Sequence, residues 1–545
     1  MRDGVVLRAD VRRPAGDGRF PTLVYRTPYG KHRAATGETI FERAVERGYA
    51  VVMQDVRGRY ASEGEFEPYR NEGRDGFDTI AWAASQPWSN GEVGTFGLSY
   101  PGAVQWLAAL ESPPALKAMV PAMTYSTPEN FFYSGGVFDL SWVPWIWNNI
   151  APDVRRRRSL PGERDGRAAR EAWQKRGESM RARLPLDALS ELRDVAPYYF
   201  EWLKHPPGDP WWDWAEVRGR YAATKAAVLN VSGWHDEAYG PEGAVTNFLG
   251  LLEARGGAQD PRAELVLGPW VHGGTGDARA GEREFGASAS LDYASLVLDF
   301  LDRHLSGRTL EAPARVRAFV MGENAWRTGA TWPLPGTTER ELRLSAPEGR
   351  GAGRLVSVPE AKPGTHSFAS NPDAPVTDPH GAAPGAHDYR ALAQRADVAV
   401  FQTEPLVEGL VLVGAIRAEI FISADAPDVD LWLKVQDVAP DGTAWNLMSP
   451  GLDVLRASYR SGGPERQLLK PGEVVPLRFE HLLTGNRFLR GHRLRVVLSP
   501  CFAPHFSRNL QTGESEVTSR RMQRAKLTVH FDAARPSRLV LPVAP

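Results

Sequence analysis

The chain reads Val93-Gly94-Thr95-Phe96-Gly97-Leu98-Ser99-Tyr100-Pro101-Gly102 where a strand pattern changes into a helix pattern. The first six of these residues form a short apolar run, and apolar residues then recur at helical spacings from Ala103 onwards. Ser99 therefore stands at a sharp corner, with glycines two before and three after it, where a strained backbone tolerates no bulk. This pattern predicts a nucleophile elbow, although Pro101 takes the usual place of the second glycine. The alternative is a glycine-rich turn in an ordinary βαβ unit.

Length and composition narrow the classes of protein to consider. A chain of 545 residues is too long for one core and is expected to form several domains. The formal net charge of −1 gives no reason to expect nucleic acid or a charged membrane as partner. One cysteine, Cys501, excludes an internal disulfide framework, and no apolar run is long enough to span a membrane. The first residues enter a strand pattern without a signal-peptide core, so a cytoplasmic location is expected, and a homodimer is left open.

The order of strand and helix patterns predicts the domain organisation. Strands alternate with helices on either side of residues 125–221, which indicates an α/β domain with a mostly parallel sheet. Residues 125–221 themselves lose strand periodicity and are expected to form a helical cap. Beyond residue 335 strand patterns follow one another without helices, which predicts a jelly-roll β-sandwich. Residues 346–388, rich in Gly and Pro, are expected to form a long surface loop. The predicted boundaries are 1–124 and 222–335 for the two parts of the α/β domain, 125–221 for the cap and 336–545 for the β domain.

Two further segments supply the partners that a nucleophilic serine needs. A serine hydroxyl is activated by a general base, and the base is oriented by a carboxylate. Asp236 and His272 each follow an apolar run at a glycine-bearing turn, and the order Ser, Asp, His is that of α/β-hydrolases. The sequence therefore predicts a triad of Ser99, Asp236 and His272. Asp236 as a helix N-cap and His272 as a structural histidine are the alternatives, and His235 is a rival base that cannot easily reach its own neighbour's carboxylate.

An oxyanion hole usually needs two donors. The backbone N–H of Tyr100, the residue after the nucleophile, is expected to be one of them. The second should come from the loop after an early strand, where Tyr29 stands in Thr27-Pro28-Tyr29-Gly30. A phenol hydroxyl can donate there, but from the residues alone Tyr29 is equally well a packed aromatic.

Five motifs carry a resemblance to a known family. They are Arg26-Thr27-Pro28-Tyr29, Gln54-Asp55-Val56-Arg57-Gly58, Gly97-Leu98-Ser99-Tyr100-Pro101-Gly102, Gly233-Trp234-His235-Asp236 and Gly268-Pro269-Trp270-Val271-His272. With these motifs the chain resembles the CocE/NonD hydrolases, the group that contains bacterial cocaine esterase, with relatives among the S15 X-prolyl dipeptidyl peptidases and the α-amino-acid ester hydrolases. The resemblance runs from Val5 to the C-terminus. It implies an α/β-hydrolase domain, a helical cap and a jelly roll, and it implies that Tyr29 supplies the second oxyanion donor.

The expected reaction is hydrolysis of an ester, or of an amide, through an acyl-enzyme, without a cofactor or a metal. The acidic residues that help α-amino-acid ester hydrolases bind an ammonium group just after the triad aspartate are not visible, because Ala238 and Tyr239 stand there. Where cocaine esterase has an aromatic side chain, Ala238 indicates a differently shaped pocket. The candidate lining residues, Ala238 apart, are aromatic: Phe131, Phe132, Trp142, Trp145 and Trp147.

Two rival functions follow from the same sequence. One is a dipeptidyl peptidase, acylase or amino-acid ester hydrolase that recognises a free α-amine. The other is a non-catalytic binding protein whose jelly roll holds carbohydrate. The intact Ser, Asp and His set argues against the second.

Overall fold

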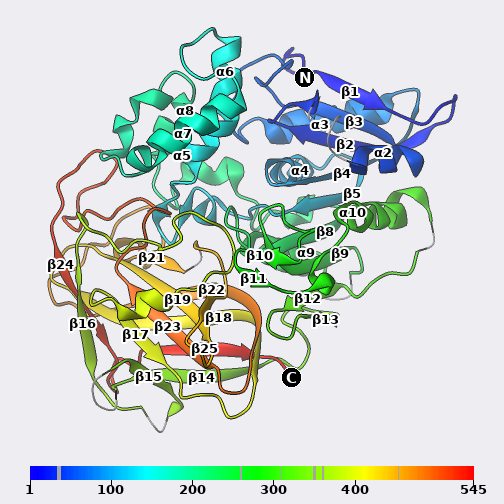
Figure 1. Ribbon diagram of the computed structural model, residues 1–545. Coiled ribbons are helices and arrows are strands. Elements are labelled where there is room, and N and C mark those ends of the chain that lie inside the picture. The colour runs from blue at the N-terminus through cyan, green and yellow to red at the C-terminus, as the bar shows by residue number, and fades with distance from the viewer. Residues whose placement is uncertain (33–38, 258–259, 309, 348–350, 359–360, 452) are drawn as a thin grey trace.

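The computed structural model describes residues 1–32, 39–257, 260–308, 310–347, 351–358, 361–451 and 453–545. The N-terminal part is built on a nine-stranded sheet in the order β1-β3-β2-β4-β5-β8-β9-β12-β13 (Figure 1). The outermost pair at each edge is antiparallel, and the pairs between them are parallel. The strands are β1 (Ala9–Arg12), β2 (Phe20–Thr27), β3 (Ala50–Asp55), β4 (Ser89–Leu98), β5 (Leu116–Ala122), β8 (Ala227–His235), β9 (Ala263–Val271), β12 (Val316–Val320) and β13 (Ala325–Gly329).

Helices cover both faces of this sheet. On one face, α2 (Thr39–Glu46) and α10 (Tyr293–Leu301) bury their apolar residues. The other face is covered by α3 (Glu72–Ser85), α4 (Tyr100–Leu110) and α9 (Glu242–Ala254). The strands are buried on both faces, as expected for a parallel sheet between helical layers. The α/β-hydrolase fold predicted from the sequence is therefore confirmed.

The cap is inserted between β5 and β8. Its helices are α5 (Trp142–Trp145), the π-helical turn η2 (Ile146–Ile150), α6 (Ala151–Arg157), α7 (Gly166–Arg181) and α8 (Pro197–Trp202). A short hairpin, β6 (Tyr133–Ser134) and β7 (Val137–Phe138), precedes them, and the cap contacts the β domain where Leu140 N–H donates to the carbonyl of His505 at 3.1 Å. Because the cap follows the end of a parallel strand, it lies over the edge of the sheet where active sites form.

The C-terminal part is a β-sandwich, in agreement with the predicted jelly-roll class. Ten of its strands follow the order β16-β24-β18-β25-β14-β15-β17-β23-β19-β20, while β21 pairs with β19 and β22 with β18. Its strands are β14 (Thr338–Ser345), β15 (Gly353–Val356), β16 (Thr365–Ser370), β17 (Ala399–Gln402), β18 (Leu410–Ala424), β19 (Asp430–Val438), β20 (Ala444–Asn446), β21 (Val454–Arg456), β22 (Val475–Phe488), β23 (Arg493–Ser499), β24 (Ala525–His530) and β25 (Arg538–Val543).

The segment 346–388 differs from its prediction as one long loop. It contains β15, which pairs with β14 and β17, and β16, which pairs with β24 at an edge of the sheet. Both strands are short and lie among Gly and Pro residues, so their period-two pattern is too brief to stand out in the sequence.

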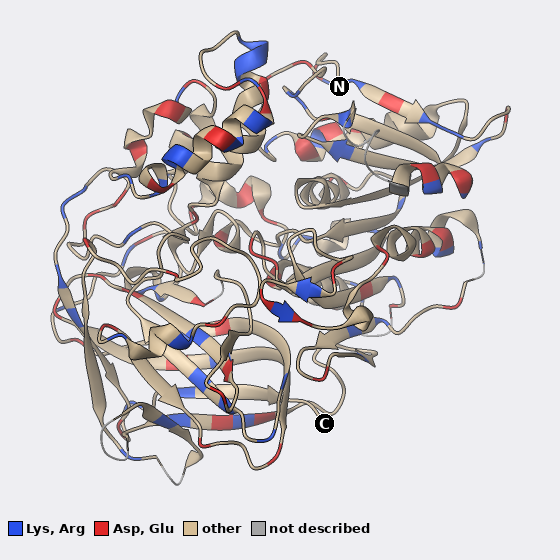
Figure 2. Ribbon diagram, in the orientation of Figure 1, with Lys and Arg blue, Asp and Glu red and all other residues tan. Residues whose placement is uncertain are grey.

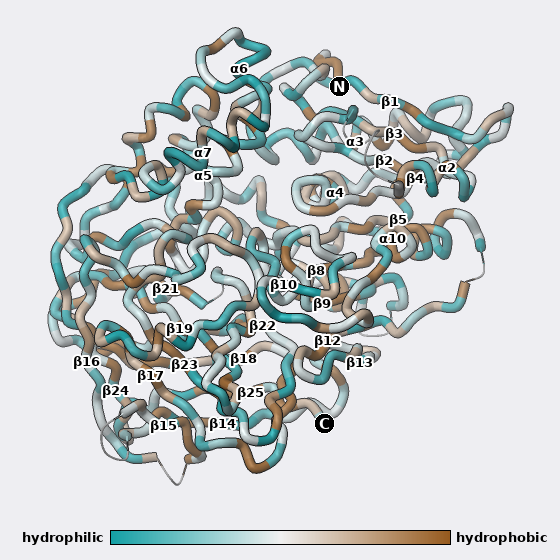
Figure 3. Tube along the Cα trace, viewed as in Figure 1, coloured by the Kyte–Doolittle hydropathy of each residue, from teal (hydrophilic) through white to brown (hydrophobic). Residues whose placement is uncertain are grey.

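Charge and hydropathy agree with this layered arrangement. Acidic and basic residues are interleaved over the helices and strands (Figure 2), in line with the near-zero net charge. Hydrophobic residues run along the sheet strands and the inner helices (Figure 3). Within the part of the chain that the structure describes, none of the helices has the length and apolar character needed to cross a bilayer.

Candidate active site

Ser99 occupies a strained corner between β4 and α4. Its backbone angles are φ 70° and ψ −129°, a conformation that residues with a Cβ rarely adopt. A Cβ on Gly97 would lie 2.5 Å from the Cβ of Pro101, and one on Gly102 would lie 2.6 Å from the carbonyl oxygen of Ala122. The two glycines are therefore needed because the chain passes too close to itself for any side chain. The result is the geometry of a nucleophile elbow.

Tyr100 begins helix α4 directly after Ser99. Its backbone N–H is in the first turn, where no intrahelical acceptor is available, so it is free to stabilise negative charge near Ser99. The phenol of Tyr100 is buried beneath the elbow, donates to Glu72 Oε1 at 2.8 Å and accepts from the N–H of Tyr69 at 3.0 Å. Glu72 in turn pairs with Arg26 at 2.8 Å, with both side chains 4% exposed. This buried network anchors the start of the helix.

Asp236 and His272 are joined at the carboxyl ends of β8 and β9. His272 Nδ1 lies 2.9 Å from Asp236 Oδ1, and the same oxygen accepts from the N–H groups of Ala238 at 3.1 Å and Tyr239 at 3.3 Å. Burial lowers the pKa of His272, but the Asp236 carboxylate outweighs this effect and the net shift of the pKa is upwards. Asp236 thus orients the imidazole and stabilises its protonated form.

Ser99 and His272 line one cavity of about 700 Å³. Because Nδ1 of His272 faces Asp236, Nε2 is the ring nitrogen left to take a proton from a nucleophile. Tyr239 also lines this cavity, and its ring centroid is 5.6 Å from that of His272. The three predicted triad residues therefore meet on one side of the molecule, each directly after a parallel strand.

Tyr29 reaches the same cavity from the end of β2. Its side chain lines the cavity together with Ser99, and its hydroxyl accepts a hydrogen bond from the Trp145 indole at 3.1 Å. Because the phenol oxygen already accepts from the indole, its own proton is directed elsewhere. Burial raises the pKa of Tyr29, so the phenol keeps that proton at neutral pH. Tyr29 is thus placed to donate to an oxyanion beside Ser99.

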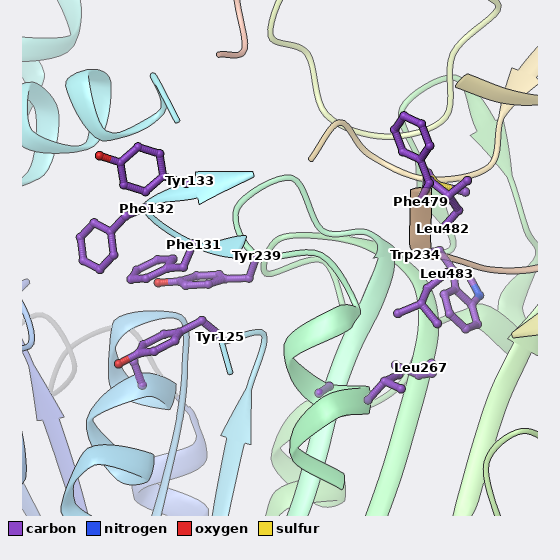
Figure 4. Close-up of a cluster of buried hydrophobic side chains, with 14 of the residues drawn as sticks. Tyr125, Phe131, Phe132, Tyr133, Trp234, Tyr239, Leu267, Phe479, Leu482 and Leu483 are labelled. Atoms are coloured by element: carbon purple, nitrogen blue, oxygen red, sulfur yellow. The ribbon is translucent and has the colours of Figure 1, made fainter. Parts of the chain in front are cut away.

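The aromatic side chains predicted to line the pocket fall into two groups. Phe131, Trp142, Trp145 and Ala238 line the cavity, and the Phe131 ring lies stacked between Tyr125 and Tyr239 (Figure 4).

Phe132 and Trp147 differ from that expectation. Phe132 packs inside the cap against Trp142 and Trp212, with ring centroids 4.9 Å and 4.4 Å away. Trp147 donates its indole N–H to the carbonyl of Ala169 at 3.0 Å and is buried in the cap. Both side chains therefore form the core that supports the lining residues.

His235, the rival base, points away from the cavity. It is fully buried, with its ring 6.4 Å from that of Phe285. Burial lowers its pKa to about 3, so the imidazole stays neutral. Asp236 accepts its hydrogen bond from His272 and not from His235.

Several residues of the site were not anticipated from the sequence. Tyr239 lines the cavity and shares a hydrogen bond of 3.2 Å with the hydroxyl of Tyr69, a second phenol on the cavity wall. Glu237 also lines the cavity, and its Oε2 accepts from the N–H of His272 at 3.0 Å. The sequence signal that could have found them is their position, because Glu237 and Tyr239 lie in the turn that begins at Asp236 and such turns lie beside the active site.

A serine at a strained elbow and an Asp–His pair that meet at one cavity are the arrangement of a serine hydrolase of the α/β-hydrolase class. Residues 3–274 match the family of X-Pro dipeptidyl-peptidases (S15 family), and residues 309–540 match the X-Pro dipeptidyl-peptidase C-terminal non-catalytic domain. The chain is 32% identical to cocaine esterase from Rhodococcus sp. (strain MB1 Bresler), over 100% of this chain and 97% of that protein. It belongs to the CocE/NonD family of hydrolases.

Solved structures agree with this assignment. An aminopeptidase from a marine sediment Thaumarchaeota archaeon superposes with a TM-score of 0.83 at 25% identity, covering 100% of this chain and 95% of that one. An α-amino acid ester hydrolase superposes with a TM-score of 0.83 at 23% identity over the same shares of the two chains. A CocE/NonD family hydrolase from Staphylococcus aureus has a TM-score of 0.71 at 20% identity, covering 100% of this chain and 92% of that one. The protein is a serine ester hydrolase.

Proposed function

We propose that Ser99, His272 and Asp236 are the catalytic triad of a carboxylic-ester hydrolase that acts on small esters with an apolar acyl group. The observation that carries the proposal is the 2.9 Å contact between His272 and Asp236 in the cavity that also holds the strained Ser99. This arrangement supplies a nucleophile, a base and an orienting carboxylate.

The reaction proceeds in two acyl transfers. His272 Nε2 takes the hydroxyl proton of Ser99 as Oγ attacks the ester carbonyl, and the tetrahedral oxyanion accepts hydrogen bonds from the Tyr29 hydroxyl and the Tyr100 N–H. The C–O bond to the alcohol breaks, and His272 gives its proton to the departing alkoxide. Water then attacks the acyl-enzyme with His272 again as base, which releases the acid and restores Ser99. Asp236 stays ionised and holds the imidazole.

The lining of the cavity favours an uncharged acyl group. Phe131, Trp142 and Trp145 present aromatic surface, and the small side chain of Ala238 leaves room beside the triad aspartate. A cavity of about 700 Å³ is in the range of small-molecule sites. Aromatic walls stabilise an apolar group by burial and ring contacts.

Glu237 supports a second candidate, an acyl group with a free α-amine. Its side chain is a carboxylate on the cavity wall. However, burial raises the pKa of Glu237, and one carboxylate oxygen is already engaged by the His272 N–H. A carboxyl group with a raised pKa and one oxygen already engaged binds an ammonium group more weakly than a fully ionised carboxylate would. We therefore rank the substrates with a free α-amine second.

A substrate panel separates these candidates. We expect methyl phenylacetate and methyl benzoate to be hydrolysed faster than phenylglycine methyl ester, which has the same leaving group, and Gly-Pro-anilide to be left intact. Ser99→Ala should lose on the order of 10³-fold or more in turnover on every active substrate. Faster hydrolysis of the amine-bearing ester, reduced in Glu237→Gln, would favour the second candidate. Turnover that survives in Ser99→Ala would overturn the proposed triad. The cytoplasmic location stays a prediction, which cell fractionation would check.

A further inference from the structure

Two histidines and a glutamate meet at the boundary between the catalytic domain and the β domain. Glu282 lies in the turn of a hairpin formed by β10 (Arg279–Ala280) and β11 (Arg283–Glu284), which follows the His272 loop (Figure 1). His380 and His387 lie in the loop between β16 and β17 of the β domain. One ligand atom from each of these three side chains lies within 4.8 Å of the other two.

Hydrogen bonds to the backbone set the tautomer of both imidazoles. His380 Nε2 lies 3.1 Å from the carbonyl oxygen of Asp388, and His387 Nε2 lies 3.0 Å from that of Pro384. A carbonyl oxygen can only accept, so each Nε2 carries the proton and each Nδ1 presents a lone pair. Metal-binding histidines are typically oriented in this way by a backbone acceptor on the other nitrogen.

The Nδ1 atom of His387 has no hydrogen-bond partner although it is buried. His387 is 7% exposed, and this nitrogen is among the buried polar atoms of the described residues that lack a partner. The nearest acid is Glu282, whose Oε2 lies 3.6 Å away, beyond hydrogen-bonding distance. Because a buried lone pair without a partner is costly, this atom points to a missing ligand.

The surrounding backbone is held firmly enough to present these groups together. The N–H of Glu282 donates to the carbonyl of Ala386 at 2.8 Å, and the N–H of His387 donates to Asn446 Oδ1 at 2.7 Å. The two imidazoles stack with their centroids 4.5 Å apart. The Glu282 side chain is 48% exposed, so it can change rotamer and leaves an entry path from solvent.

We propose that Glu282, His380 and His387 bind a Zn²⁺ ion that fastens the catalytic domain to the β domain. Two neutral imidazoles and a carboxylate are a donor set that zinc accepts, with water in the fourth position. Bonds of about 2.0–2.1 Å place tetrahedral ligands roughly 3.3 Å apart, so atoms that lie within 4.8 Å of one another need to close in by at most about 1.5 Å. Rotation of the half-exposed Glu282 side chain supplies part of this movement, and small turns of the two imidazoles supply the rest. The ion connects the hairpin after His272 to the β16–β17 loop.

A Zn²⁺ titration tests this proposal. Protein without a histidine tag is stripped with EDTA, dialysed and titrated with ZnCl₂ by calorimetry, and the Co²⁺ form is examined for the absorption bands of a tetrahedral ion. We expect one ion per chain, and a Tm that rises with Zn²⁺. Glu282→Gln and His380→Ala should each bind on the order of 10-fold more weakly or worse. His481→Ala, which removes an exposed histidine elsewhere in the β domain, is the matched control and should bind as the wild type does.

Failure of the zinc proposal can be told apart from failure of the proposed hydrolase function. Glu282→Gln replaces a half-exposed side chain by one of the same shape, so circular dichroism should show that this variant folds. A substitution of the buried His387 could instead prevent folding, which is why Glu282 is the better position for the test. No saturable Zn²⁺ binding by the wild type would overturn the proposal. Equal binding by the wild type, Glu282→Gln and His380→Ala would overturn it as well. Neither result depends on Ser99.

Discussion

Replacing Tyr29 by Phe removes one hydroxyl from the wall of the active-site cavity. The phenol lines the cavity together with Ser99 and accepts from the Trp145 indole at 3.1 Å, so the substitution deletes one of two oxyanion donors and keeps the ring. Loss of one such donor costs about 10²–10³-fold in kcat, or about 2.7–4 kcal/mol of transition-state stabilisation. The backbone N–H of Tyr100 remains as the second donor. We therefore expect a loss near the lower end of this range, with KM changed little, because the oxyanion exists only after attack.

The assay is steady-state hydrolysis of a p-nitrophenyl ester, with kcat and KM measured separately. Tyr239→Phe is the matched control, since it also removes a phenol from the cavity that holds Ser99 but leaves Tyr29 in place. We expect Tyr239→Phe to lose less than about 10-fold in kcat, well under the loss of an oxyanion donor. If Tyr29→Phe keeps nearly full kcat while Tyr239→Phe loses it, the donor has been assigned to the wrong tyrosine.

The remaining predictions concern the residues around the nucleophile. Asp236→Asn should lower kcat by about 10⁴-fold, because the amide no longer selects the productive tautomer of His272. In the wild type, kcat/KM should fall as the pH drops through the raised pKa of His272, with a midpoint above 6.5. In Asp236→Asn the midpoint of the pH–rate profile should move to lower pH, because burial still lowers the pKa while the carboxylate that raises it most is gone and only Glu237 still raises it. An unmoved midpoint would contradict the assignment. Glu72→Gln breaks the buried ion pair with Arg26 and should reduce the free energy of unfolding by about 3–5 kcal/mol, as measured by denaturant titration. An unchanged denaturant concentration at the unfolding midpoint would show that this network does not anchor the elbow. Gly102→Ala places a Cβ 2.6 Å from the Ala122 carbonyl oxygen, so the variant should lose esterase activity, and full activity would disprove the tight packing.

The elbow and the fold class could be predicted from the sequence because their signals are local. Ser99, Asp236 and His272 each follow an apolar run at a turn, and parallel strands bring such turns to one edge of the sheet. The alternation of strands and helices, and then the run of strands alone, predicted an α/β domain with a mostly parallel sheet followed by a β-sandwich. The motif around Ser99 and the family resemblance added the hydrolase fold.

The inner surface of the cap could not be predicted to the residue. Phe131 and Phe132 are neighbours with the same chemistry, yet the first lines the cavity and the second packs on Trp212. Their positions depend on how several short helices and turns pack together, and no single period describes that segment. The place of Tyr239 on the cavity wall was missed for a related reason, because it depends on how the turn after Asp236 packs against its neighbours.

Active-site labelling tests the central claim most directly. The intact protein is treated with a fluorophosphonate, and the adduct is located by peptide mass spectrometry while its rate of formation is compared with that of His272→Ala. We expect one adduct, on Ser99, and we expect it to form on the order of 10³-fold more slowly in His272→Ala than in the wild type. An adduct on another residue, or labelling of Ser99 that is equally fast in His272→Ala, would contradict it.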